Sequence, residues 1–230
     1  IAAIMFGLAF STIHAVDAIE NPPPDEPAMH YNVTGFQFGW KYNYTGEGGI
    51  GWQNISEWTV PSNTVVIMNI TSQDVWHNFA FPNFRIRVDA IPGEVNHLWF
   101  KATDIGDERN VCVQICGTGH ATMKAALHVV SPADYAKFVH DSSMESYAKL
   151  AKKNSVNATF DGAVFNVPAL AKSGPAALSI ANNGTSAATF YIDAPGNAIH
   201  VQPGQTGFLF VPAGAGHKLV SSTGASQAVS

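Results

Sequence analysis

Cys112-Val-Gln-Ile-Cys116-Gly-Thr-Gly-His120-Ala-Thr-Met123 is the most informative segment of this chain, and it holds both cysteines among the 230 residues. Two thiolates, an imidazole and a thioether lie within one short segment. Soft sulfur ligands combined with imidazole suit copper. One cysteine would make a mononuclear blue-copper site, whereas two cysteines this close can bridge a pair of copper ions. A second imidazole must then come from elsewhere, and His77, in Asp74-Val-Trp-His77-Asn-Phe, is the best candidate.

Each of these residues also has an ordinary structural explanation. The two cysteines would form a disulfide in an oxidising compartment, but a disulfide does not account for a histidine and a methionine at this spacing. His77 alone would be a core or surface histidine, and Met123 alone would fill a core. The combination within one segment favours the metal site.

The donor residues resemble a known motif. They match the binuclear CuA motif of subunit II of the heme–copper oxygen reductases, the cytochrome c oxidase family, at His77, Cys112, Gln114, Cys116, His120 and Met123. Gly35–Tyr44 resembles the aromatic strand of that family, and Asp89–Asn96 resembles the loop after its first ligand histidine. The resemblance covers residues 1–140, and residues 141–230 do not resemble the family.

The resemblance implies one role for each ligand: bridging thiolates from Cys112 and Cys116, one imidazole for each copper from His77 and His120, and weak axial ligands from Met123 Sδ and the Gln114 carbonyl oxygen. Weak axial ligands tune the reduction potential. Asp74 and Asn110 are expected to support the ligands through hydrogen bonds.

By the same resemblance, this chain would be the CuA subunit through which electrons enter a terminal respiratory oxidase. It would accept one electron at a time from an external donor, with Phe38 and Trp40 at the point of arrival. The electron would pass to the heme–copper catalytic subunit, subunit I, near Arg85, Arg87 and Asp89. Oxygen reduction to water would occur in that partner, which alone would carry heme, in a complex with other membrane subunits.

Two departures from the best-known family members resemble its B-type branch. Gln114 stands where many members carry a glutamate that binds Mg²⁺ at the subunit interface, and a neutral amide is a poor Mg²⁺ ligand. No Mg²⁺ is therefore expected from Gln114. Phe38, followed by Gly39, stands where a tryptophan usually receives electrons from cytochrome c. The expected donor is a small copper protein or a cytochrome, and an archaeal source fits this pattern.

Four alternatives remain. A stand-alone CuA electron carrier or copper-delivery protein would use the same ligands. A quinol oxidase subunit II would have lost those ligands. A nitrous-oxide reductase would carry a large catalytic domain, and a purely structural β-sandwich would hold no metal.

The N-terminal segment, residues 1–20, is predicted to be a transmembrane helix that ends before Pro22-Pro-Pro24. At 1.5 Å per residue it would reach about 30 Å, close to the thickness of a bilayer core. A signal peptide is the alternative. The chain would then sit in the cell membrane with its soluble part on the outer, periplasmic or extracellular, face. N-glycosylation there is expected at six Asn-X-Ser/Thr sequons: Asn32, Asn43, Asn54, Asn69, Asn157 and Asn183.

The composition and the positions of turn-forming residues determine the domain prediction. The net charge of −5 argues against a nucleic-acid partner. Short β-branched and aromatic runs separated by Gly, Pro, Asn and Asp predict strands. We therefore predict a mainly β protein: a cupredoxin-like antiparallel sandwich over residues 30–131, a helical linker over 132–154, and a second small β-sandwich, without cysteine, over 155–230. Its role is not indicated by the sequence.

Overall fold

The computed structural model describes residues 1–170 and 173–229, so Ala171, Lys172 and Ser230 of the predicted C-terminal domain lie outside the described residues. The chain divides into two compact units. The first comprises residues 1–44 and 53–135, and the second comprises residues 45–52 and 136–230.

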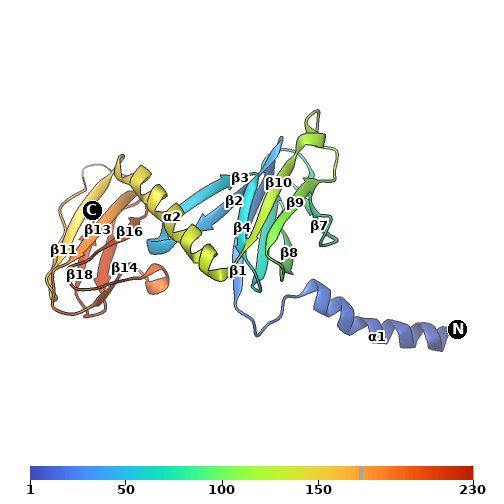
Figure 1. The fold of residues 1–230 in the computed structure, drawn as a ribbon, viewed down its shortest axis with the longest axis horizontal. Coiled ribbons are helices and arrows are strands. Elements are labelled where there is room, and N and C mark those ends of the chain that lie inside the picture. Colours follow the sequence, from blue (N-terminus) through green and yellow to red (C-terminus); the bar gives the residue numbers. More distant parts are fainter. Residues whose placement is uncertain (171–172, 230) are drawn as a thin grey trace. The chain divides into compact units, whose positions relative to one another are not determined.

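Two five-stranded sheets form the first unit (Figure 1). One sheet has the order β3 (Gly51–Ile55), β2 (Gly39–Thr45), β1 (Ala28–Phe36), β5 (Val65–Ser72) and β8 (Asn96–Lys101). The other has the order β4 (Glu57–Pro61), β10 (Lys124–Val130), β9 (Gly106–Cys112), β6 (His77–Phe81) and β7 (Ile86–Ala90). Short 3-10 turns lie at Glu47–Gly49 (η1) and His120–Thr122 (η2).

An aromatic core joins the two sheets. The alternation of buried and exposed residues along β5 and β10 follows the two-residue period of a half-buried strand. Tyr42 of the first sheet stacks on Trp58 of the second, with ring centroids 5.1 Å apart. Trp58 also meets Phe100 edge to face at 5.7 Å. Such a core makes a rigid scaffold for the loops at its ends.

The predicted mainly β class with an apolar N-terminal helix is confirmed, but the sheets are mixed rather than wholly antiparallel. β1 pairs with β5 and β4 pairs with β10 in parallel. Parallel neighbours need a long crossover, which the intervening strands supply. The expected single aromatic strand over Gly35–Tyr44 is also interrupted. It is a hairpin in which Phe36 pairs with Gly39 and residues 37–38 form the turn.

The second unit holds a smaller sandwich of two four-stranded sheets, as the sequence predicts. The first sheet is β12 (Phe165–Asn166), β11 (Ser155–Phe160), β13 (Ala176–Asn182) and β16 (Thr206–Val211). The second is β15 (Ile199–Val201), β14 (Ala188–Ile192), β17 (His217–Ser221) and β18 (Ser226–Val229). A 3-10 turn, η3, spans Pro195–Asn197. Phe160, Phe165 and Phe190 fill the core between the sheets.

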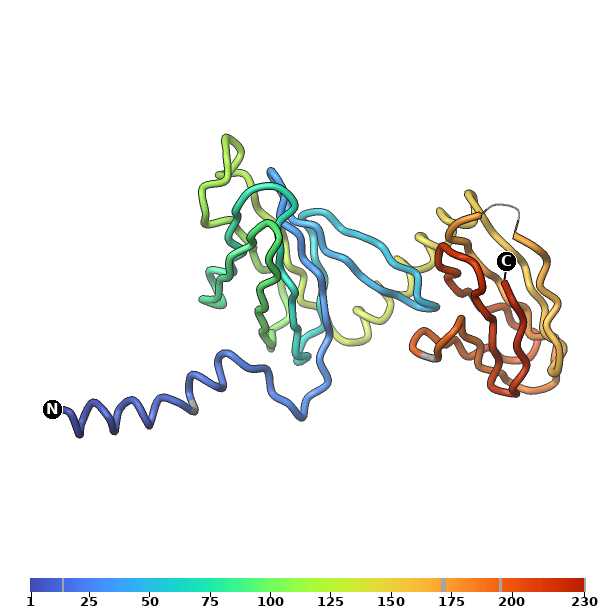
Figure 2. Tube along the Cα trace, turned by 180° about the vertical axis from the view of Figure 1, so that it is seen from behind, coloured from blue at the N-terminus to red at the C-terminus, as the bar shows by residue number. Residues whose placement is uncertain are grey.

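Two α-helices complete the described chain. α1 (Ala2–Glu20) is long and apolar enough to cross a membrane, a property that signal sequences share. α2 (Pro132–Ala151) is capped by Ser131, because the Asp134 backbone N–H donates to Ser131 Oγ at 3.1 Å. Figure 2 traces the chain from α1 through both sandwiches.

Candidate metal centre

The segment from Cys112 to Met123 is a loop between adjacent strands β9 and β10. Cys112 is the last residue of β9, and its backbone N–H donates to the Met123 carbonyl oxygen at 3.1 Å. This bond closes the loop at its base. His77 begins β6, next to β9, where Phe79 pairs with Cys112. The sheet therefore brings His77 to the loop across 35 residues of sequence.

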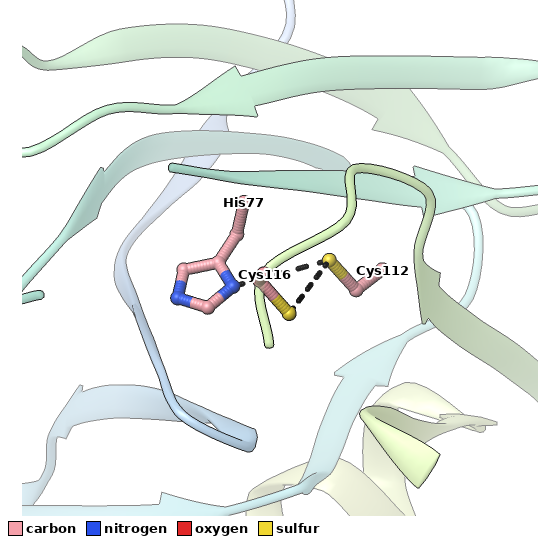
Figure 3. Close-up of side chains that lie close together, drawn as sticks. All are labelled: His77, Cys112 and Cys116. Carbon is pink, nitrogen blue, oxygen red and sulfur yellow. Dashed lines mark hydrogen bonds between the residues drawn. The ribbon is translucent and has the colours of Figure 1, made fainter. Parts of the chain in front are cut away.

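The structure brings the predicted donor atoms together, and Figure 3 shows three of the side chains. His77 Nδ1 lies 3.9 Å from Cys112 Sγ, and the two cysteine sulfurs are 3.9 Å apart. Cys116 Sγ also lies 3.6 Å from His120 Nδ1 and 3.8 Å from Met123 Sδ. The Gln114 carbonyl oxygen accepts from Cys112 Sγ at 3.2 Å. The Gln114 carbonyl oxygen thus faces the cluster.

The donor cluster lies just beneath the surface. His77 is fully buried, and Cys112, Cys116 and Met123 are also buried. His120 is half-buried. Burial excludes water from the sulfur atoms, while the half-buried imidazole keeps the cluster close to solvent.

Asp74 fixes the orientation of the His77 ring. His77 Nε2 donates to Asp74 Oδ1 at 2.8 Å, so Nδ1 is left to face the sulfur atoms. Asp74 also accepts from the backbone N–H of Gln37 and Val75, each at 2.7 Å. Burial raises the pKa of Asp74, but the hydrogen bonds from His77, Gln37 and Val75 outweigh it, and the net pKa lies below its usual value. The carboxylate is therefore ionised at neutral pH.

The two thiols are free rather than bonded to each other. Their sulfurs are 3.9 Å apart, nearly twice the length of a disulfide bond. Burial, followed by repulsion from the neighbouring Cys112, raises the pKa of Cys116 to about 11. A metal ion that binds Cys116 must therefore displace its proton.

The cluster fits a metal. His77, Cys112 and Cys116 offer ligand atoms within 4.8 Å of one another, and no other such group of histidines, cysteines and carboxylates occurs among the described residues. An ion that bonds sulfur at about 2.3 Å can bridge sulfurs up to about 4.6 Å apart, so the observed separation is within reach. Thiolate, thioether and imidazole together favour copper.

The two aromatic residues expected to receive electrons lie in different environments. Phe38 is 36% exposed, and its ring lies against the loop at Gly117 and Gly119. A Cβ at Gly119 would lie 2.4 Å from the Phe38 ring, so only glycine leaves room for this contact. Trp40 is fully buried and meets the His77 ring at a centroid distance of 5.9 Å.

The other predicted residues lie near the site without contacting its donor atoms. Asn110 donates to the Ala80 carbonyl oxygen at 3.0 Å, so it ties β9 to β6 rather than holding a ligand. Arg87 and Asp89 line an open surface cleft of about 500 Å³ together with Trp76 and the Gln114 side chain. Asp89 accepts from Asn78 Nδ2 at 2.6 Å.

Two residues that contribute to the site were not predicted. Gln37 Nε2 donates to the Cys116 carbonyl oxygen. Ser72 Oγ donates to the Val75 carbonyl oxygen at 2.6 Å and shapes the turn that carries Asp74. Gln37 lies within Gly35–Tyr44, the segment that resembles the aromatic strand of the family. Its contact with the Cys116 carbonyl depends on the hairpin turn at residues 37–38, and a single continuous strand would have no such turn.

The histidines of the second unit are engaged in local hydrogen bonds. His200 Nδ1 lies 3.1 Å from Thr189 Oγ1, and His217 Nδ1 lies 2.6 Å from Asp193 Oδ2. The latter pair joins β17 to the residue that follows β14.

Fold and donor set together define a metal-binding domain of cupredoxin-like architecture. The family model for the periplasmic domain of cytochrome c oxidase subunit II matches residues 53–130. The heme–copper oxidase subunit 2 of Aeropyrum pernix is 38% identical over 134 residues, covering 57% of this chain and 57% of the relative. The cytochrome c oxidase subunit 2 of Alkalihalophilus pseudofirmus is 31% identical over 134 residues, covering 58% of this chain and 38% of the relative.

Among solved structures, the periplasmic domain of subunit II of cytochrome oxidase from Bradyrhizobium japonicum is 32% identical, with a TM-score of 0.47 over 54% of this chain and 96% of that one. Residues 53–130 therefore form a domain of the cytochrome c oxidase subunit II family. It spans little more than half of the first curated relative and less than half of the second.

Proposed function

We propose that this chain accepts electrons, one at a time, at a binuclear copper centre and delivers them to the heme–copper catalytic subunit of a terminal respiratory oxidase. One observation carries the proposal: the donor atoms of His77, Cys112, Cys116, His120 and Met123, with the Gln114 carbonyl, converge on one loop cluster. Family membership supports the same activity.

The number of donors favours two metal ions over one. Structural zinc takes four ligands, whereas six donors gather here. Two ions that share both thiolates would each also have one imidazole and one weak donor. When bound, such a pair would supply one-electron transfer, with the odd electron shared between the two ions. The buried cage holds the ligands in place, and this limits the structural change that accompanies each transfer.

The surface around the loop suits an apolar electron donor. Exposed apolar side chains outside the cleft of Arg87 and Asp89 belong to the segments that contribute to the site: Phe38, Val75 and Ile115. Phe38 offers a donor an aromatic contact over the ligand loop, and buried Trp40 lies against His77. An uncharged patch recognises its partner by apolar contact, so the docking rate depends weakly on salt. A small copper protein or a cytochrome with an apolar face fits this surface.

The partner side of the site is expected at the cleft that contains Arg87, Asp89 and the Gln114 side chain. Subunit I, with heme, and further membrane subunits would assemble there. The neutral Gln114 amide supports the expectation of no Mg²⁺ at this position.

Placement on the outer face of the cell membrane, anchored by α1, is part of the proposal. Asn183, in the turn after β13, is the exposed sequon least constrained by a strand. Asn32 and Asn69 instead hydrogen-bond to each other in mid-sheet at 3.1 Å. Glycosylation is therefore expected first at Asn183. The C-terminal sandwich is proposed to fold separately, free of metal, in a docking role.

Purification of the full chain with its membrane partners tests the proposal. We expect about two copper ions per chain, paramagnetic resonance coupled equally to two copper nuclei, and co-purifying heme subunits. Coupling to a single copper nucleus would refute the binuclear centre. A copper-loaded chain that never associates with heme proteins would favour the stand-alone carrier.

A further inference from the structure

Gln37 connects the hairpin turn between β1 and β2 to two separate segments of the metal site. Its side-chain Nε2 donates to the carbonyl oxygen of Cys116, in the middle of the ligand loop. Its backbone N–H donates to Asp74 Oδ2 at 2.7 Å, and Asp74 Oδ1 holds His77. One residue thus reaches the ligand loop directly and the distant histidine through a carboxylate.

The neighbouring contacts strengthen this connection. Phe38, the other turn residue, lies with its ring against Gly117 and Gly119 of the ligand loop. A Cβ at Gly117 would lie 2.8 Å from Gln37 Nε2 and 3.1 Å from the Phe38 ring. The loop therefore carries glycine where the turn presses on it. On the other side of the turn, the Gln73 backbone N–H donates to the Gly35 carbonyl oxygen at 3.0 Å.

The ligand loop has few other ties to the scaffold between its two ends. Cys112 is fixed by its bond to Met123, and the Val113 N–H donates to the Asn78 carbonyl oxygen at 3.1 Å. The backbone N–H groups of His120, Thr122 and Met123 donate to carbonyl oxygens within the loop itself. The bond from Gln37 is thus placed where the loop most needs an external support.

We propose that Gln37 is a positioning residue that holds the Cys116 side of the ligand loop in its metal-binding shape before metal arrives. The inference rests on the proposed copper site, because the loop is the one that would bind the ions. Gln37 is exposed, so the hydrogen bond of its side chain contributes modestly, at the scale typical of one such bond. Its effect is local order rather than global stability.

Gln37→Met tests the role, because methionine keeps the approximate length of the side chain and cannot donate. The backbone bond to Asp74 survives any substitution, so the variant isolates the side chain. Gln37→Glu keeps the shape but places a carboxylate against a carbonyl oxygen, and its effect should be larger. Gln53→Met is the matched control, since Gln53 donates to Asn43 Oδ1 at 2.7 Å on a sheet surface.

Amide hydrogen exchange of the metal-free full chain in detergent provides the first measurement. The amides of His120 and Thr122 should exchange about two- to tenfold faster in Gln37→Met, the factor expected for one net hydrogen bond, while amides of β10 and the control remain unchanged. After copper loading, release to a chelator should accelerate by a similar factor.

Loop exchange equal to that of the unaltered chain in both Gln37 variants would overturn the inference. Equal acceleration throughout the first unit would overturn it too, since the role would then be general stability. If the unaltered chain fails to bind a coupled copper pair, the proposed function fails, yet the exchange comparison still decides the role of Gln37.

Discussion

Replacing Asp74 by asparagine should weaken copper binding through His77, although Asp74 offers the metal no ligand. The Asp74 carboxylate accepts three hydrogen bonds. Oδ1 accepts from His77 Nε2 at 2.8 Å and from the Val75 backbone N–H at 2.7 Å, and Oδ2 accepts from the Gln37 backbone N–H at 2.7 Å. Asparagine has one oxygen and one NH₂ group. If its oxygen serves His77, its NH₂ meets the Gln37 N–H, donor against donor. If it flips, its NH₂ meets His77 Nε2.

The flipped arrangement favours the wrong histidine tautomer. His77 Nε2 would then accept a hydrogen bond, and the proton would move to Nδ1, which faces Cys112 Sγ at 3.9 Å. A protonated nitrogen cannot bind metal. Either arrangement loses a buried or partly buried bond, and loss of such a ligand-supporting partner typically lowers metal affinity by about 10- to 100-fold. Competition with a copper chelator, read from the visible spectrum, measures this affinity.

Asp107→Asn is the matched control, because Asp107 forms the same kind of pair with His128 at 2.7 Å on the exposed face of β9 and β10. The control should bind copper like the unaltered chain. Asp74→Asn with an affinity within about twofold of the unaltered chain would contradict the expected 10- to 100-fold loss, and the tautomer argument would be wrong.

Three further predictions concern the cysteine bridge, the aromatic contact and the second unit. Cys116→Ser should bind about one copper per chain and lose the spin coupling to two equivalent nuclei, because Cys112 alone leaves a mononuclear donor set; retention of two coupled ions in the resonance spectrum would refute the bridge. Phe38→Ala should slow reduction by the natural donor by about fivefold in stopped-flow measurements, the cost of losing one aromatic contact, with the copper spectrum unchanged; an unaltered rate would exclude Phe38 from docking. In the second unit, hydrogen bonds from the Lys218 backbone and from His217 lower the pKa of Asp193. The ionised Asp193 carboxylate therefore stabilises the fold at any pH above the ordinary pKa of an aspartate. This stabilisation is lost as the pH falls through the lowered pKa of the folded state. Protection of the β17 amides, relative to their intrinsic exchange rates, should therefore fall below a pH of about 4 less steeply in Asp193→Asn than in the unaltered chain. Parallel profiles would show that Asp193 does not couple to folding.

The sequence indicates the candidate site where its chemistry is local. Cys112 and Met123 lie within one loop, so their spacing already indicates a shared centre, and the need for a second imidazole indicates His77. The sandwich architecture followed from the strand pattern. These features depend on residue type and on short-range spacing, which a sequence displays directly.

The sequence did not predict which strands pair with each other. The hairpin at residues 37–38 looked like the interior of one aromatic strand, because Phe, Trp and Tyr continue on both sides of it. Only the pairing of Phe36 with Gly39 reveals the turn, and only the parallel pairing of β1 with β5 places that turn beside Asp74. The sequence also does not show that residues 45–52, at the tip of the β2–β3 hairpin, belong to the second unit. The spacing of turn residues marks where strands end, but it does not show which unit the tip of a hairpin joins.

Rigidity of the ligand loop follows from the way these distant elements meet. A site that only relays electrons works best when its ligands move little between oxidation states. Here the base of the loop is closed by the Cys112–Met123 backbone bond, and its middle is held by Gln37. His77 enters from a neighbouring strand with its ring fixed by Asp74. Each support comes from the protein rather than from a metal, so the shape of the cage is set by the fold. The same hairpin turn that supports the loop also presents Phe38 at the surface, and a donor that docks on this ring would therefore contact a part of the scaffold already coupled to the ligands.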